Sequence, residues 1–241
     1  MWITRTDPSA SLIRSVLERH NILATVVQAI GIEPISPALL LRYEAAGIAS
    51  LCEASSVDVD VVVLVSRHAA RLYRESEFFL PECKHIAIGD ATLKALAADG
   101  DVASGANSEG LLEHPLLQRG PEQVLVVAGQ GGRETLLNAL CARKEALFKL
   151  ELYKRVVQNL ARLLTMEGDI IEISSVAALA AVNAHLVATH DKHVYHSVRL
   201  VVPSRRLASA ARGLGFIDPV IAVSANVADM AEAISRVEMP H

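Results

Sequence analysis

QVLVVAGQGGRETLLNALCARKEALFKLELYKR, residues 123–155, predicts a strand, a glycine turn, a helix and a second strand in direct succession. The first strand is Val124 to Ala128, a valine-rich apolar run typical of a strand buried on both faces. The turn contains three glycines: Gly129, Gly131 and Gly132. An amphipathic helix follows, and the apolar strand Leu147 to Leu152 then leads to Tyr153. Because a helix that begins just after a glycine turn attracts anions, this turn is a candidate binding site.

The glycine turn does not match the known nucleotide-binding loops. The dinucleotide pattern G-x-G-x-x-G requires a third glycine where this chain has Glu134. A Walker loop requires Gly-Lys-Ser/Thr at its end, and the turn lacks this triplet. A nucleotide-binding Rossmann protein is therefore disfavoured, and a tight βα turn without any ligand stays open as an interpretation of the turn alone.

Composition and charge narrow the class of protein. The chain has 241 residues, of which 51% are hydrophobic and 21% charged, so it is long and apolar enough for one large α/β domain or two smaller ones. Its formal net charge is −4 and only 4% of its residues are aromatic. Nucleic-acid binding is disfavoured, because it usually needs a basic face and aromatic residues that stack on bases.

The cysteines and the apolar runs indicate a cytoplasmic protein. The three cysteines, Cys52, Cys83 and Cys141, form no CxxC pair, so we expect free thiols in a reducing compartment. Residues 1–5 lack the apolar core of a secretory signal. The apolar run Val61 to Val65 is far too short to span a membrane, so we expect no membrane partner.

Strands alternate with helices along the whole chain, which predicts parallel sheets covered by helices on both faces. The expected strands are residues 2–6, 24–30, 57–65, 85–89, 124–128, 147–152, 170–173, 198–202 and 220–223. Leu39 to Leu51 predicts a short helix, and Pro34 and Pro37 predict a linker or a domain edge.

The two halves of the chain resemble each other. VVVLVSRHAARL (61–72) resembles IIEISSVAALAAV (170–182), since each is a strand that ends in serine before an alanine-rich helix. AIGDATLKALAADG (87–100) resembles VVPSRRLASAARGLG (201–215), and the two units follow in the same order in each half. Two similar domains are therefore favoured over one large sheet.

A series of short motifs runs in order through nearly the whole chain. The motifs are Ile3-Thr4-Arg5 with Pro8, Val65-Ser66, Ile88-Gly89 with Ala91-Thr92, Ser108-Glu109-Gly110-Leu111-Leu112, Gly129-Gln130-Gly131-Gly132-Arg133-Glu134, Tyr153-Lys154-Arg155, Ser204 with Arg206-Leu207-Ala208, and Leu214-Gly215-Phe216. Each motif is weak alone, but their order and spacing resemble the uroporphyrinogen-III synthase family.

The chain departs from the family pattern at three places. Two residues separate Arg5 from Pro8, so the proline is displaced. Ala128 stands where bacterial members commonly carry an arginine before the glycine turn. Glu172 and Ser174 replace a more apolar strand and a threonine.

The resemblance implies an α/β fold of two similar domains with parallel sheets flanked by helices, joined by a two-stranded linker, with the active-site cleft between them. The implied discontinuous domain is residues 1–34 plus 158–241, and the inserted domain is residues 38–152. The implied linkers lie near residues 35–37 and 153–157.

The resemblance also implies an activity in haem biosynthesis. Family members cyclise hydroxymethylbilane, a linear tetrapyrrole with eight carboxylates, with loss of water and inversion of the last pyrrole ring. The family uses no metal or organic cofactor, so we expect none, and we expect a monomer that could meet the upstream bilane-forming enzyme. The alternative is a non-catalytic two-domain ligand-binding protein on the same fold, which Ala128 and the altered N-terminal turn favour.

The candidate site residues follow from the sequence pattern and from the family resemblance. Tyr153 offers a hydroxyl that could act as the acid or hydrogen-bond donor to the leaving group, although a tyrosine packed at a domain junction is the plain alternative. The predicted substrate-binding residues are Arg5, Ser66, Thr92, Gly129, Gly131, Gly132, Arg133, Ser174, Ser204 and Arg206. Their hydroxyls, backbone N–H groups and guanidinium groups could hold carboxylates. Helix N-caps and solvated surface arginines are the alternatives.

The histidines His185, His190, His193 and His196 form a sequence cluster between a predicted helix and a strand. The cluster lacks the HExxH spacing and the cysteine partners of zinc sites, so it predicts a polar connecting loop and no metal site.

Overall fold

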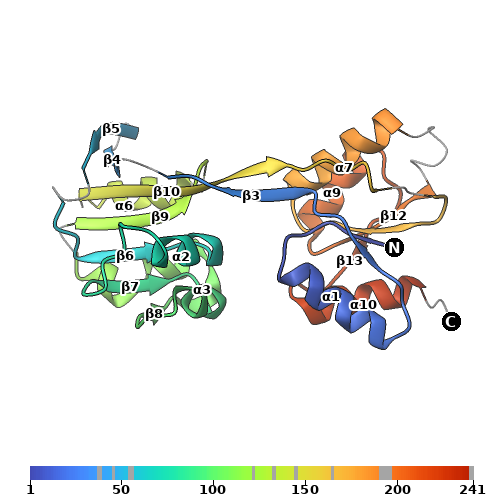
Figure 1. Cartoon of the computed structure of the whole chain (residues 1–241), viewed down its shortest axis with the longest axis horizontal. Helices are drawn as coiled ribbons and strands as arrows, with labels where there is room; N and C mark the ends of the chain where they lie inside the picture. Colours follow the sequence, from blue (N-terminus) through green and yellow to red (C-terminus); the bar gives the residue numbers. More distant parts are fainter. Residues whose placement is uncertain are drawn as a thin grey trace. The chain divides into compact units, whose positions relative to one another are not determined.

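The computed structural model describes residues 1–36, 40–44, 47–53, 57–120, 123–131, 134–143, 146–163, 166–189 and 197–238. The chain divides into two compact units, which are Met1–Gly31 with Val156–His241 and Ile32–Arg155 (Figure 1). The first unit is assembled from both ends of the chain, and the second is one continuous segment.

The unit made from the two chain ends contains a five-stranded sheet with the order β13-β12-β11-β1-β2, in which all neighbours are parallel. Its strands are β1 (Trp2–Ile3), β2 (Thr25–Val26), β11 (Ile170–Glu172), β12 (Arg199–Val202) and β13 (Val220–Ile221). Its helices are α1 (Ser9–Arg19), α7 (Val176–Thr189), α9 (Arg205–Gly213) and α10 (Val227–Glu238).

Helices cover both faces of this sheet because its strands are apolar on both faces. Leu200 and Val202 of β12 pack in one core with α7 and α9. Val201, which lies between them, packs in the other core with α1 and α10. Successive residues of a strand point to opposite faces, so a continuous apolar run buries both.

The continuous unit contains an eight-stranded sheet with the order β5-β4-β10-β9-β6-β7-β8, and β3 also pairs with β10. Its strands are β3 (Ile30–Pro34), β4 (Leu40–Glu44), β5 (Gly47–Cys52), β6 (Val61–Leu64), β7 (Lys84–Ala87), β8 (Asp101–Val102), β9 (Gln123–Gly129) and β10 (Ala146–Val157). From β10 to β8 neighbours are parallel, whereas β4 and β5 are antiparallel additions at the β10 side. β3 and β10 are the two strands in which the chain passes from one unit to the other.

Helices also cover both faces of this second sheet (Figure 1). They are α2 (Arg67–Arg74), α3 (Asp90–Leu96), α4 (Ser108–Leu112), α5 (Pro115–Gln118) and α6 (Glu134–Cys141), with a short 3₁₀ turn, η2, at Ser104–Ala106. Val62 and Leu64 pack with α2 and α3, while Val61 and Val63 pack with α4, α5 and α6. The expected α/β fold with parallel sheets flanked by helices is therefore confirmed, and the exact domain bounds stay a prediction.

The helix predicted for Leu39 to Leu51 is wrong, because the described part of this segment forms the antiparallel strands β4 and β5. Leu41 of β4 lies opposite Lys149 of β10. The edge of β10 offers backbone N–H and C=O groups that need partners, and a strand supplies them where a helix cannot. Within the described ranges, no helix is both long and apolar enough to cross a membrane.

Candidate active site

Tyr153 packs directly against Gly129. A bulge in β10 between Glu151 and Tyr153 places Tyr153 beside Gly129, the last residue of β9. A Cβ atom on Gly129 would lie 2.4 Å from two atoms of the Tyr153 ring, and the tyrosine is only 1% exposed. The N–H of Gln130 donates to the carbonyl oxygen of Tyr153 at 2.7 Å. The glycine is therefore required by the ring that occupies its side-chain space.

Among the residues that the structure describes, the Tyr153 hydroxyl has two polar neighbours. Its oxygen lies 3.1 Å from the Ser66 hydroxyl, and Arg155 donates to it from Nη2 at 3.3 Å. The Arg155 guanidinium also lies 5.4 Å from the centre of the Tyr153 ring. Ser66 in addition accepts a hydrogen bond from the N–H of Ala69, so it caps α2 while it contacts the phenol.

His68 also contacts the Tyr153 ring. The two ring centres are 5.9 Å apart in an edge-on arrangement. Burial lowers the pKa of His68, and the positive charges of Arg67, Arg71 and Arg155 lower it further. The imidazole is therefore neutral near pH 7, and Arg155 supplies a cation that contacts both the ring and the hydroxyl of Tyr153.

Tyr153 lines a pocket of about 320 Å³ at the carboxyl ends of β6, β7 and β9. Its polar lining residues are Ser66, Ser108, Lys149, Tyr153 and Arg155. Its apolar lining residues include Val65, Ile88, Val126, Leu136 and Leu137. Open α/β sheets bind ligands at this end of their strands, and an apolar pocket with a few convergent polar groups is the usual form of such a site.

Lys149 contributes a buried cation to the pocket. It is 4% exposed, and its Nζ lies 2.6 Å from Oε1 of Glu151, two residues further along β10. The ammonium also lies 5.7 Å from the centre of the Tyr43 ring. Lys149 is not among the residues predicted from the sequence, although a lysine inside the apolar run LFKLEL is a signal that could have drawn attention to it.

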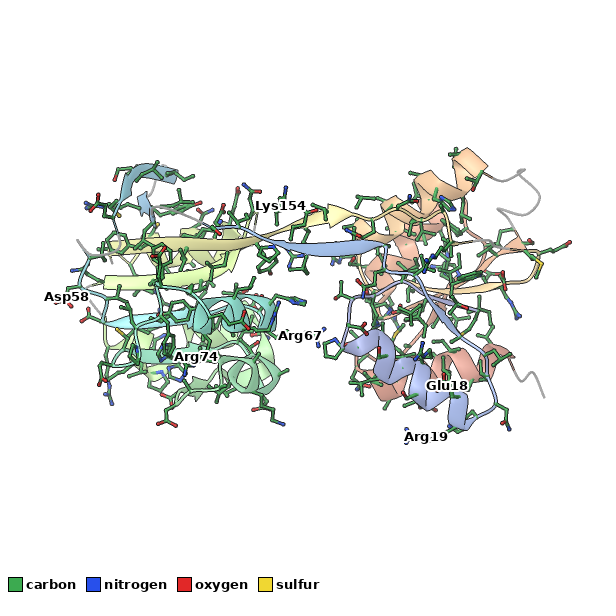
Figure 2. The ribbon with its side chains drawn as sticks, viewed as in Figure 1. Glu18, Arg19, Asp58, Arg67, Arg74 and Lys154 are labelled. Carbon is green, nitrogen blue, oxygen red and sulfur yellow. The ribbon has the colours of Figure 1, made fainter. Side chains whose placement is uncertain are left out.

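Arg155 and His68 are also absent from the predicted site residues. Arg155 lies in the Tyr153-Lys154-Arg155 motif, two residues beyond the tyrosine, so the motif itself carried the signal. His68 offered no such signal, because only the packing of α2 brings its ring to β10. Lys154, labelled in Figure 2, is half-exposed and pairs with Glu33 at 3.0 Å.

The predicted residues Ser66, Gly129, Gly131 and Tyr153 all line this one pocket. Gly131 has a φ of +65°, a left-handed conformation that favours glycine. Thr92 lies inside α3, is 5% exposed and does not line the pocket. Gly132 and Arg133 lie outside the described residues.

Arg5 forms a buried ion pair with Glu172 in the unit made from the chain ends. Its Nη2 and Nε atoms lie 2.6 Å and 2.8 Å from Oε1 of Glu172, and Nη1 donates to the carbonyl oxygen of Ala225 at 3.1 Å. The N–H of Thr4 donates to the other carboxylate oxygen at 3.3 Å. Burial raises the pKa of the Glu172 carboxyl, and Arg5 opposes that rise. The guanidinium is therefore already engaged by a carboxylate of the protein.

The three other predicted residues of this unit follow strands of its sheet. Ser204 accepts a hydrogen bond from the N–H of Leu207 at 3.3 Å and caps α9. Arg206 is exposed in the first turn of the same helix. Ser174 is half-buried just beyond β11, and Ser175, its neighbour, caps the next helix through the N–H of Ala178.

Comparison with known proteins assigns the chain to a family. The family model described as uroporphyrinogen-III synthase HemD matches residues 13–232. The chain belongs to the uroporphyrinogen-III synthase family. The uroporphyrinogen-III synthase of Salmonella typhimurium is 29% identical over 190 residues, which cover 72% of this chain and 77% of that protein. The Escherichia coli enzyme of the same name is 26% identical, with coverage of 93% and 95%.

Solved structures of the family share this fold. A uroporphyrinogen-III synthetase of Helicobacter pylori aligns with a TM-score of 0.60 and 13% identity over 97% of both chains. A mutant uroporphyrinogen III synthase of the extremely thermophilic bacterium Thermus thermophilus aligns with a TM-score of 0.55 and 15% identity, with coverage of 98% and 97%. At these identities the likeness establishes the fold alone.

The residues that the structure describes contain no group of three histidine, cysteine, aspartate or glutamate side chains placed to hold a metal ion. His185 lies on α7, with Nε2 3.1 Å from the carbonyl oxygen of Leu163. The other three histidines of the sequence cluster lie outside the described residues.

Proposed function

We propose that this chain is an active uroporphyrinogen-III synthase, which cyclises hydroxymethylbilane with loss of water and inversion of the last pyrrole ring. Family membership supports the reaction. The observation that carries the proposal is the Tyr153 hydroxyl, held 3.1 Å from Ser66 and 3.3 Å from Arg155 at a lined pocket.

The first step of this reaction needs a proton for the leaving hydroxyl. The bond between the hydroxymethyl carbon and its oxygen breaks, and the protonated oxygen leaves as water. Donation of the pyrrole nitrogen lone pair into the ring stabilises the resulting cation, an azafulvene. Tyr153 is placed to supply that proton or a hydrogen bond to the leaving oxygen. Arg155, which donates to the phenol oxygen, would stabilise the negative charge left there.

The second step joins the ends of the chain. The carbon of the last ring that bears its linking substituent attacks the azafulvene, which gives a spiro intermediate. Reopening and reclosure then invert that ring, and loss of a proton restores aromaticity. Much of the rate gain is expected to come from holding the substrate in its folded conformation, since positioning alone can contribute about 7–11 kcal/mol.

The pocket beside Tyr153 is suited to a part of this substrate. Its volume of about 320 Å³ is at the small end of ligand sites, which typically span roughly 300–1,000 Å³, so it would hold one end of a tetrapyrrole. The mixture of apolar walls with Ser66, Ser108, Lys149 and Arg155 matches a pyrrole ring that carries acidic side chains.

The remaining expectations stay proposals. The substrate-binding roles of Arg5, Thr92, Gly132, Arg133, Ser174, Ser204 and Arg206 belong to these, as do the domain bounds and the cleft between the domains. For partners and location, we propose a cytoplasmic monomer that receives its substrate from the bilane-forming enzyme.

The test of this function is the isomer of the product. Hydroxymethylbilane is generated in situ, the protein is added, and type I and type III uroporphyrinogen are resolved after oxidation. We expect type III to dominate, with type I alone in the protein-free control. Type I alone in both samples would overturn the enzymatic proposal and favour a non-catalytic ligand-binding protein on the same fold.

A further inference from the structure

Lys149 is a cation in a place where a charge is costly. It lies inside β10, between the neighbouring strands β4 and β9, and only 4% of it is exposed. Burying an ammonium group is unfavourable unless the group is paired and hydrogen-bonded. The partners of Lys149 therefore indicate what it does.

The protein supplies fewer partners than the ammonium can accept. A protonated lysine has three N–H donors. Within the part of the chain that the structure describes, its one hydrogen bond is to Glu151 at 2.6 Å, supplemented by the Tyr43 ring at 5.7 Å. Two donors are thus available to a further acceptor, and Lys149 lines the pocket whereas Glu151 does not.

The sheet around Lys149 leaves room for that acceptor. Lys149 lies opposite Val126 of β9, and Glu151 lies opposite Ala128. Val126 and Ala128 belong to the core that faces α6, so the lysine lies on that side of the sheet at the pocket. Ala128 and Gly131 line the same pocket as Lys149, and neither has a side chain beyond Cβ that could fill the pocket.

We propose that Lys149 binds one carboxylate of the tetrapyrrole at the inner end of this pocket, with Glu151 holding the ammonium in position. This inference rests on the proposed function and names a residue that determines substrate affinity. Lys149 supplies a cation to the same pocket that Ala128 of the neighbouring strand lines. In a poorly hydrated pocket a charge-assisted hydrogen bond is stronger than one at the surface.

Five variants test this role. Lys149→Met removes the charge at nearly constant length, and Lys149→Arg keeps it. Glu151→Gln keeps the ammonium but removes its partner, and Lys149→Met with Glu151→Gln removes both charges together. Lys154→Met is the matched control, since it makes the same substitution at an exposed site of the same strand (Figure 2).

We expect Lys149→Met and the double variant to raise KM for hydroxymethylbilane about 10- to 100-fold, with a smaller change in kcat. Lys149→Arg restores part of the affinity. Glu151→Gln should raise KM less than Lys149→Met does, because the ammonium remains but loses the partner that positions it. Lys154→Met should leave KM within about threefold of the parent value. Equilibrium binding of uroporphyrinogen III under anaerobic conditions should show the same order, which separates affinity from turnover.

A double variant that folds and has the parent KM would overturn the proposal, because the pair would then be structural only. A KM of Lys149→Arg as high as that of the double variant would overturn it as well, because a retained cation would then have no effect on affinity. This comparison keeps the test valid if Lys149→Met does not fold. If the parent protein makes type I alone, the proposed function fails and this inference fails with it. The product isomer of the parent protein thus separates the two failures.

Discussion

The ring of Tyr153 in β10 fills the space that a side chain on Gly129, the last residue of the neighbouring strand β9, would occupy. A Cβ atom on Gly129 would lie 2.4 Å from the Cε2 and Cζ atoms of the Tyr153 ring, closer than any real contact allows. The position of the phenol hydroxyl is therefore set by the absence of a side chain on the partner strand. The glycine turn was first considered as an anion-binding loop. Its first glycine, Gly129, also provides the surface against which the Tyr153 ring packs.

Gly129→Ala should displace Tyr153. Inserting a methyl group into a packed site costs about 1–3 kcal/mol of stability, and a displacement of roughly 1 Å near the chemistry can lower the rate about 100-fold. Thermal unfolding and the rate of type III formation measure the two effects. Gly213→Ala is the control, because nothing lies within 4 Å of a Cβ atom there, and it should preserve activity. Equal activity of both variants would contradict the fixed position of the ring.

Tyr153→Phe should lower kcat by about 10²- to 10⁴-fold if the phenol transfers the proton. The ring still fills its site, so the unfolding temperature should change little. Tyr73→Phe is a matched control, since Tyr73 is fully buried in the same unit and accepts a hydrogen bond from the N–H of Leu80. Burial raises the pKa of Tyr73 to about 12, and its hydroxyl lies outside the pocket. Comparable loss of activity in both variants would refute a special role of Tyr153.

Arg155→Met should lower kcat about tenfold or more, and Arg155→Lys should retain part of the activity, because a lysine keeps the charge but not the guanidinium geometry. The effect acts through the phenol oxygen, so the two substitutions Arg155→Met and Tyr153→Phe should not be additive. A double-mutant cycle on kcat measures this coupling. Full additivity would show that Arg155 acts elsewhere.

Glu172→Ala should lower the free energy of unfolding by about 3–5 kcal/mol, because it leaves the Arg5 guanidinium buried without its carboxylate. Replacing both residues by methionine should recover most of that stability. Urea unfolding of the two proteins measures the difference. The double variant then tests the proposed carboxylate contact of Arg5, since an unchanged KM would remove Arg5 from the substrate-binding residues.

His85 should make the protein less stable at acidic pH. It is 3% exposed, stacks on Phe79 with ring centres 5.7 Å apart, and its Nε2 is buried with no hydrogen-bond partner among the described residues. Burial lowers the pKa of His85, so folding favours the neutral ring. The contribution of His85 to stability is complete above its unfolded pKa of about 6.5 and is lost as the pH falls through its folded pKa.

His85→Leu should therefore flatten the dependence of unfolding free energy on pH below about 6.5. Urea unfolding between neutral and acidic pH, with the parent protein measured in parallel, checks this. His68, whose pKa is also lowered, should still contribute a slope of the same sign. An unchanged curve in His85→Leu would assign the whole acid sensitivity to other groups.

The alternation of strands and helices was predictable because the apolar pattern of each element is a local property of the sequence. Val61 to Leu64 is apolar at every position, which requires burial on both faces, and the structure places helices on both. Strands β4 and β5 were missed because the leucine, arginine, glutamate and alanine residues of this segment favour a helix locally. What makes them strands is the edge of β10, which lies about a hundred residues away in the sequence.

The candidate site was predictable in part for the same reason. Ser66 and Gly129 each stand at the end of a strand, and the parallel register of β9 and β10 brings Tyr153 beside Gly129, so their common location follows from the pairing of the strands. Arg155 and Lys149 were not singled out, because a lysine or arginine in a sequence is usually solvated. The burial of Lys149 and the hydrogen bond from Arg155 to Tyr153 distinguish them, and neither can be read from the sequence.

The sequence by itself thus determined the α/β class, the strand-end positions of the site and the family, because apolar periodicity and short motifs are local properties of the chain. Tertiary structure alone decided which charges are paired. Arg5 was expected to face a substrate carboxylate and meets Glu172, while Lys149 was expected to lie within an apolar strand and lines the pocket. The physical reason is that the energy of a charged side chain depends on its burial and on its distances to other charges and hydrogen-bonding groups, which folding brings together.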